Sequence, residues 1–114
     1  MEATIYFNPK CGTCQKTLAL LVSKKFTVNK IEYLKTPPSE EELDGILKKL
    51  GIKPEELARK KEPVYAEKAE GKSLTHDQWL KLLHENPVLI ERPVVVIGNK
   101  AIVARPPEKL LEIL

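Results

Sequence analysis

The 114-residue chain lacks the features of a membrane protein or a nucleic-acid-binding protein. Its longest uninterrupted apolar stretches, such as residues 18–22 and 94–97, are far shorter than the roughly 20 residues that a membrane span needs. Its formal net charge is only +3, and positive and negative residues are interspersed, so we expect no nucleic-acid partner. The first residues show no basic region followed by an apolar core, which predicts no secretory signal and a cytoplasmic location.

Cysteine is scarce as well, since the chain has only Cys11 and Cys14. In a reducing cytoplasm, two cysteines are more often reactive thiols than a structural disulfide. The sequence also has no internal repeat, linker or low-complexity tract. Its 42% hydrophobic and 31% charged residues are typical of a globular protein, and we expect one domain over residues 1–114.

The start of the chain predicts a βαβ unit. Residues 4–7 are apolar and β-prone, and residues 28–34 form a second strand. Between them a helix is expected from Gly12. One face of this helix is predicted to carry Leu18, Leu21 and Val22. A strand, a helix and a strand over about thirty residues imply two parallel strands with a right-handed crossover.

The middle of the chain is predicted to be helical. Ser39 with Glu42, and Thr75 with Gln78, have the spacing of capping boxes. In this motif, each of the two residues uses its side chain to satisfy a backbone N–H group of the other at the start of a helix. Gly51 is placed to end the first of these helices, because glycine adopts the left-handed conformation common there.

The end of the chain returns to strands. Residues 94–97, a turn at Gly98-Asn99 and residues 101–104 are typical of a hairpin. A final helix is predicted from Pro106, and its inner side is expected to carry Leu110, Leu111 and Leu114. The whole order indicates an α/β protein of the thioredoxin-like fold. It would have a four-stranded mixed sheet and a helical insertion between the second and third strands, at about residues 39–86.

The segment Cys11-Gly12-Thr13-Cys14 lies between the first strand and its crossover helix, and this placement makes the C-x-x-C spacing informative. A sulfur at a helix N-terminus faces unpaired backbone N–H groups and the positive end of the helix dipole, which favour the thiolate. Cys11 is therefore the predicted nucleophile, and Cys14 lies close enough to attack a mixed disulfide on Cys11. Three alternatives stay open: a zinc site, for which His76 and His84 have an unusual spacing, two inert buried thiols, and a structural disulfide.

Only three of the 19 basic residues are arginines, namely Arg59, Arg92 and Arg105. The planar fork of an arginine binds tetrahedral oxyanions through two N–H groups at once. Arg92 and Arg105 flank the final hairpin and are placed to reach the sheet end that carries Cys11. The competing interpretation is that all three are solvated surface residues. In thioredoxin-like folds the loop that faces the active cysteine often carries a cis proline, so we predict a cis bond before Pro93 as a structural feature of the site.

The loop Asn8-Pro9-Lys10-Cys11-Gly12-Thr13 resembles the active-site loop of the ArsC arsenate reductases of the glutaredoxin-linked type. The other segments that match this family, in order, are Tyr33-Leu34-Lys35-Thr36-Pro37-Pro38-Ser39, Leu57-Ala58-Arg59-Lys60, Asn86-Pro87-Val88-Leu89-Ile90-Glu91-Arg92-Pro93 and Arg105-Pro106. The resemblance covers essentially the whole chain. Several spaced motifs that agree are more specific than a C-x-x-C alone.

The resemblance implies a thioredoxin-like fold and an enzyme that reduces arsenate to arsenite. It implies that Cys11 holds the position of the nucleophile. It also implies that Arg59, Arg92 and Arg105 hold positions that bind the oxyanion and the arsenic intermediates. The co-substrate implied for this family is a thiol reductant, glutathione with glutaredoxin, and we expect neither a bound cofactor nor a metal.

Two residues depart from the family pattern. Cys14 stands where well-known arsenate reductases of this type carry serine, and an extra thiol there offers an internal route to resolve an intermediate on Cys11. Thioredoxin is therefore an alternative electron donor. Phe7 stands where these enzymes can carry histidine, so stabilisation of the Cys11 thiolate would depend more on the helix end and on the arginines.

Two other functions stay open. A general thiol–disulfide oxidoreductase would use Cys11 and Cys14 as its redox pair. A redox-sensing regulator of the Spx type, from the same family, would use the pair as a switch and bind RNA polymerase. Such regulators do not share the Arg-Pro pair that Arg105-Pro106 supplies here, which favours an enzyme.

Overall fold

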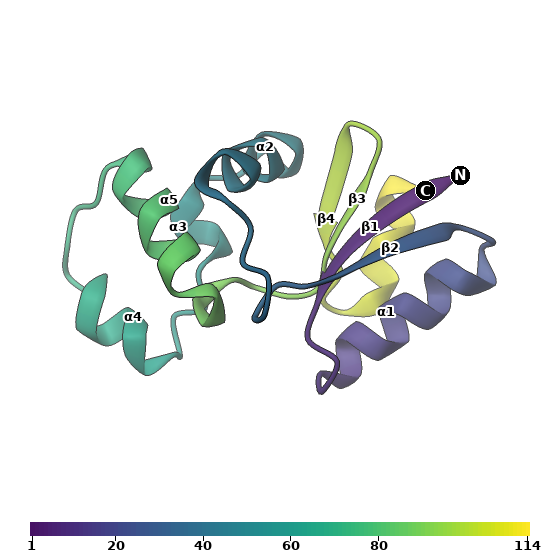
Figure 1. Cartoon of the computed structure of the whole chain (residues 1–114), viewed down its shortest axis with the longest axis horizontal. Coiled ribbons are helices and arrows are strands. Elements are labelled where there is room, and N and C mark those ends of the chain that lie inside the picture. Colours follow the sequence, from purple (N-terminus) through teal and green to yellow (C-terminus); the bar gives the residue numbers. More distant parts are fainter. The chain divides into compact units, whose positions relative to one another are not determined.

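The computed structural model describes residues 1–114, which fall into two compact units (Figure 1). The first unit comprises Met1–Thr36 and Arg92–Leu114 and contains all four strands, and the second comprises Pro37–Glu91 and is built from helices. The predicted insertion at about residues 39–86 lies inside the second unit. The single domain expected over residues 1–114 stays a prediction. None of the helices has the length and apolar character needed to cross a membrane.

The first unit is built on the four-stranded mixed sheet that the sequence predicts. Its strands are β1 (Glu2–Phe7), β2 (Thr27–Glu32), β3 (Val94–Ile97) and β4 (Lys100–Val103), in the order β2-β1-β3-β4. β1 and β2 are parallel, with Phe7 opposite Glu32, whereas β1 with β3 and β3 with β4 are antiparallel. β2 stops two residues before its predicted end because the chain turns, and the N–H groups of Lys35 and Thr36 both donate to the carbonyl of Glu32.

One face of the sheet is covered by α1 (Gly12–Ser23) and by the C-terminal 3₁₀-helix η2 (Pro107–Ile113), which is drawn in yellow in Figure 1. The buried cluster between these layers consists of Ala3, Ile5, Leu21, Val95, Ala104 and Leu110. Its members alternate along β1, as expected for a strand with one side turned to a core. This packing fixes α1 against the sheet, and so fixes the helix end that carries the cysteines.

Two predictions about helix faces are wrong. In α1, Leu21 is fully buried but Val22 is 60% exposed, because one residue further along an α-helix turns a side chain by about 100° away from the core. At the C-terminus, Leu110 is buried, whereas Leu111 and Leu114 are 52% and 48% exposed. This segment is a 3₁₀-helix with about three residues per turn, so Leu110 shares its inner face with Ile113 instead.

The second unit contains four α-helices and a short 3₁₀-helix. These are α2 (Glu40–Leu50), α3 (Pro54–Leu57), α4 (Pro63–Lys68), α5 (His76–Glu85) and η1 (Pro87–Leu89). α2 begins where predicted, since the Ser39 hydroxyl accepts a hydrogen bond from the N–H of Glu42, and it ends at Gly51 with a φ of 69°. The capping box of Thr75 and Gln78 is present at the start of α5.

Candidate active site

Cys11 lies in the short loop between β1 and α1. Its N–H donates to the carbonyl of Asn8 over 2.9 Å, and its own carbonyl accepts the first helical hydrogen bond of α1, from the N–H of Gln15 over 3.1 Å. The Gln15 side chain also donates to the carbonyl of Pro9 over 2.7 Å. The loop is therefore tied to the helix that follows it, and the Cys11 sulfur is held at the helix N-terminus.

The guanidinium of Arg105 reaches this sulfur. Its Nη1 lies 3.8 Å from the Sγ of Cys11 and also donates to the carbonyl of Arg92 over 3.2 Å. The sheet explains the approach, because Val94 in β3 pairs with both Tyr6 near the end of β1 and Val103 at the end of β4. Arg92 comes just before β3 and Arg105 comes just after β4, so both lie at the end of the sheet that carries the cysteine loop.

Both arginines precede a cis proline. The Arg92-Pro93 bond is cis, as predicted, and the Arg105-Pro106 bond is cis as well, which sequence reasoning did not anticipate. The N–H of Ala104 donates to the carbonyl of Pro93 over 3.0 Å and ties the two segments together. The Nε of Arg92 is buried and has no hydrogen-bond partner, so this site retains an unused donor.

These neighbours make Cys11 an acidic thiol. Burial by itself would raise the pKa of Cys11, but other groups outweigh it. The backbone N–H and thiol of Cys14, the Arg105 guanidinium and the charge of Arg92 favour the thiolate, and together they lower the pKa of Cys11 to about 7. A large share of Cys11 is therefore the nucleophilic thiolate at neutral pH.

Cys14 has the opposite character. It is fully buried, whereas Cys11 keeps 9% of its surface exposed, and both are free thiols. Burial raises the pKa of Cys14 most, and the neighbouring Cys11 sulfur raises it further. The backbone N–H of Asn8 and the charge of Arg92 act against this, and the result is a pKa of about 12. Cys14 is thus a protonated thiol beside a thiolate.

Arg59 belongs to the second unit. The N–H of Arg59 donates to the carbonyl of Leu89 over 2.7 Å, and the guanidinium is held by two carboxylates. Its Nη1 lies 2.8 Å from Oε1 of Glu62, and its Nε lies 3.5 Å from Oε1 of Glu91. The structure therefore brings Cys11, Cys14, Arg92 and Arg105 together in the first unit, while the role of Arg59 at that site stays a prediction.

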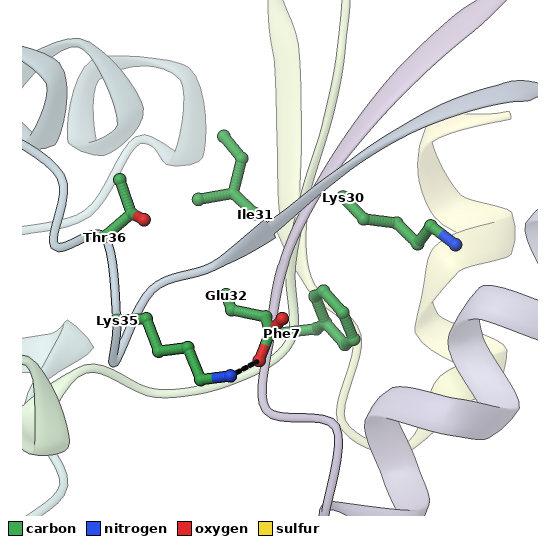
Figure 2. Close-up of a pocket in the computed structure, with 6 residues that line it drawn as sticks. All are labelled: Phe7, Lys30, Ile31, Glu32, Lys35 and Thr36. Carbon is green, nitrogen blue, oxygen red and sulfur yellow. Dashed lines mark ion pairs between the residues drawn. The ribbon is translucent and has the colours of Figure 1, made fainter.

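A separate hollow of about 530 Å³ lies in the first unit beside the end of β2 (Figure 2). It is lined by Phe7, Lys30, Ile31, Glu32, Lys35 and Thr36. Figure 2 shows the Lys35 ammonium directed at Glu32, and the two form an ion pair of 3.5 Å. None of the predicted site residues lines this hollow. No cluster of three or more His, Cys, Asp or Glu side chains that could hold a metal ion occurs in the structure.

Sequence reasoning did not identify the residues that hold the cysteine loop and the Arg59 side chain in place. The side chain of Gln15 ties the cysteine loop to α1, but nothing in the sequence distinguishes Gln15 from other exposed helix residues. Glu62 and Glu91, which hold Arg59, are 29 positions apart in sequence, so no local pattern links them. The only signal in the sequence is that Glu91 lies directly before the Arg92-Pro93 pair.

The sheet order and the two cysteines at the start of α1 define a protein of the thioredoxin-like fold with a C-x-x-C motif. The particular family follows from comparison with known proteins. The model of the ArsC family matches residues 6–113. The chain belongs to the ArsC family.

Three of the similar proteins are matched over at least 96% of their own length. An uncharacterized protein of Escherichia coli strain K12, YfgD, is 39% identical over 98% of this chain and 96% of its own. An arsenate reductase of Haemophilus influenzae is 40% identical over the whole of both chains. Among solved structures, an arsenate reductase from Vibrio cholerae has a TM-score of 0.95 and 43% identity, covering 100% of this chain and 98% of that one.

Proposed function

We propose that this protein is an arsenate reductase that uses Cys11 as its nucleophile. The observation that carries the proposal is the Arg105 guanidinium, 3.8 Å from the Cys11 sulfur, together with the charge of Arg92, which also favours the Cys11 thiolate. This arrangement offers a thiolate and two cationic forks to one small anion. Full-length relatives named arsenate reductase support the same activity.

Arsenate is a tetrahedral dianion near neutral pH, and its oxygens would be bound by charge-assisted hydrogen bonds from Arg92 and Arg105. The family resemblance adds Arg59 to this set. The unpartnered Nε of Arg92 supports a binding role, because a substrate oxygen would satisfy it. The Cys11 thiolate then attacks arsenic, and a covalent thiol–arsenate adduct forms.

A second thiol must complete the reduction. This thiol attacks the Cys11 sulfur of the adduct and forms a disulfide with it. The sulfur–arsenic bond breaks, its electron pair stays on arsenic, and arsenite leaves. A thiol reductant is therefore a required partner, either glutathione with glutaredoxin or thioredoxin. We place the reaction in the cytoplasm, where thiols are kept reduced.

Coupled assays with purified protein test the proposal. NADPH consumption is followed with arsenate, using either glutathione, glutaredoxin and glutathione reductase, or thioredoxin and its reductase. We expect consumption that depends on arsenate with at least one donor, and none with Cys11→Ser. Arsenate reduction by Cys11→Ser at the wild-type rate would remove Cys11 from its role.

The same assays address the two alternative functions. A general thiol–disulfide oxidoreductase would consume NADPH with a disulfide substrate and show no stimulation by arsenate. A redox-sensing regulator would show no turnover at all. The family match and the relatives named arsenate reductase favour neither of these.

A further inference from the structure

Cys14 is placed to reach the Cys11 sulfur. Cys11 is the N-cap residue of α1 and Cys14 is the third residue of the helix, and the Gln15-to-Cys11 hydrogen bond shows that the first turn is already helical. Residues three apart in a helix have Cα atoms about 5 Å apart, from the rise and radius of the helix. That separation lies inside the range that a disulfide spans.

From this geometry we propose that Cys14 resolves the adduct on Cys11 and releases arsenite as an internal disulfide closes. This step deepens the proposed function and rests on it for the arsenate adduct. It also specifies the reductant, because a Cys11–Cys14 disulfide is opened most directly by a dithiol protein such as thioredoxin.

Burial favours an internal thiol over one from solution. Cys14 has no exposed surface, and Cys11 keeps only 9% of its own. A glutathione molecule has to reach a sulfur that would carry arsenate, whereas Cys14 already lies on the protein side of that sulfur. An attack within one chain also has an effective concentration far above that of any dissolved thiol.

The charge on Cys11 prevents Cys14 from reacting too early. In the resting protein the Cys11 sulfur raises the pKa of Cys14, in addition to the effect of burial. When that sulfur bonds to arsenic it loses its charge, so this part of the effect disappears. The backbone N–H of Asn8 and the charge of Arg92 remain, and both favour a Cys14 thiolate. Formation of the adduct therefore removes one cause of the raised pKa of Cys14.

The atoms and electrons balance in two steps. The Cys11 thiolate forms a bond to arsenic, and one arsenate oxygen leaves as hydroxide, which takes up a proton to become water. Cys14 then loses its proton and forms a bond to the Cys11 sulfur, and the sulfur–arsenic electron pair stays on arsenic. Each sulfur is oxidised by one electron, arsenic(V) becomes arsenic(III), and the arsenite takes up the Cys14 proton with two protons from water.

A single-turnover experiment without added thiol tests this step. Fully reduced protein, freed of reductant, is mixed with excess arsenate, and arsenite and remaining protein thiols are counted. We expect the wild type to form one arsenite per chain and to lose both thiols. Cys14→Ser keeps a hydroxyl donor beside Cys11 but cannot form the disulfide, so it should form no arsenite. Wild-type protein that forms no arsenite here, yet turns over with glutathione and glutaredoxin, would overturn the proposal.

An arsenate-free experiment separates this proposal from the proposed function. Oxidised glutathione reacts with Cys11 to give a mixed disulfide and one glutathione, and Cys14 should then displace the second glutathione. Mass spectrometry should show an internal disulfide in the wild type and a stable glutathione adduct in Cys14→Ser. If the wild type also accumulates the adduct, Cys14 is not a resolving thiol. If the internal disulfide forms but arsenate is never reduced with any donor, the role of Cys14 stands and the arsenate function fails.

Turnover gives a third readout. With thioredoxin as the donor, Cys14→Ser should lose at least about 100-fold in rate, because an intramolecular attack is replaced by one from solution. Alkylation of Cys11 in this variant should keep its pH dependence, since the serine hydroxyl still donates to the thiolate. An unchanged thioredoxin-driven rate would contradict the proposal.

Discussion

A few neighbouring groups determine how readily Cys11 loses its proton. Cys14 contributes a backbone N–H and a thiol, Arg105 contributes a guanidinium, and Arg92 contributes charge at longer range. Each favours the thiolate, and together they exceed the cost of burial. The Cys11 thiolate is therefore stabilised by the same two arginines that the proposed function assigns to arsenate binding.

The first prediction concerns the pH dependence of Cys11. Its pKa is lowered to about 7, so the thiolate fraction rises as pH increases through that value and levels off above it. The rate of alkylation by iodoacetamide should follow this curve, with a midpoint near pH 7. Cys14 should stay unmodified across the range in folded protein, because it is buried and its pKa is raised to about 12. A midpoint near that of an ordinary cysteine would contradict this description.

The second prediction concerns Arg105. Arg105→Ala removes a positive charge from a sulfur 3.8 Å away, which should raise the pKa of Cys11 by roughly one unit. The alkylation midpoint then moves to higher pH, and the rate at pH 7 falls. Arg105→Lys is the matched control, since it keeps the charge and should shift the midpoint less. Equal midpoints for the wild type and Arg105→Ala would show that Arg105 does not stabilise the thiolate.

At the scale of residues, the sequence predicts the acidity of Cys11 better than it predicts the contacts around the two cysteines. The helix start after a strand identifies Cys11 as a thiolate, and the structure agrees on its pKa. The sequence did not show that Cys14 stays protonated, because this depends on how deeply the fold buries its thiol. The hydrogen bond from Arg105 to the carbonyl of Arg92 could not be inferred either, because it joins residues 13 positions apart.

At the scale of elements, short polar motifs fix where the helices of the second unit begin. α5 starts at a reciprocal pair, in which the Thr75 hydroxyl accepts from the N–H of Gln78 over 3.2 Å and Oε1 of Gln78 accepts from the N–H of Thr75 over 2.8 Å. The helix then buries Trp79 and Leu83 in its own unit. Its stability depends on both the cap and the buried face.

The third prediction tests this cap. Thr75→Ala leaves the N–H of Gln78 without its acceptor and should lower the free energy of unfolding by about 1 kcal/mol. Urea denaturation measures the change, and Thr75→Ser is the matched control because it keeps the hydroxyl. Alkylation of Cys11 should not change in either variant, since Thr75 belongs to the other unit. Equal unfolding midpoints for Thr75→Ala and Thr75→Ser would show that the cap adds nothing.

Elements were predictable where a local signal marks them. The capping residues, Gly51 and the Gly98-Asn99 turn located α2, α5 and the hairpin of β3 and β4. α4 was not predicted as a separate helix because it has no buried residue, and so no apolar periodicity. The faces of η2 were assigned wrongly because the sequence does not reveal whether a short helix has 3.0 or 3.6 residues per turn.

At the scale of the whole molecule, the residues predicted for the site are divided between the two units of the chain. Cys11, Arg92 and Arg105 belong to the sheet unit, and Arg59 belongs to the helical unit. The spacing of residues could not assign Arg59 to the site, and only the family resemblance does. The structure adds that Arg59 is held within its own unit by Glu62 and Glu91 and by a backbone bridge between Ala58 and Ile90. Its guanidinium is therefore held in one orientation within that unit.

The last prediction separates binding by Arg59 from activation of Cys11. Arg59 is not among the groups that lower the pKa of Cys11, so Arg59→Lys should leave the pH profile of alkylation unchanged. The lysine keeps the charge but cannot bind an oxyanion through a planar fork, so KM for arsenate should rise by about tenfold, the loss expected for one charge-assisted hydrogen bond.

Steady-state kinetics and alkylation of the same protein samples measure the two effects. Lys60→Ala removes a neighbouring exposed charge and should change neither, so it controls for the general loss of positive charge. An unchanged KM in Arg59→Lys would place arsenate binding in the sheet unit alone. A shifted alkylation profile would instead mean that Arg59 acts on the thiolate itself.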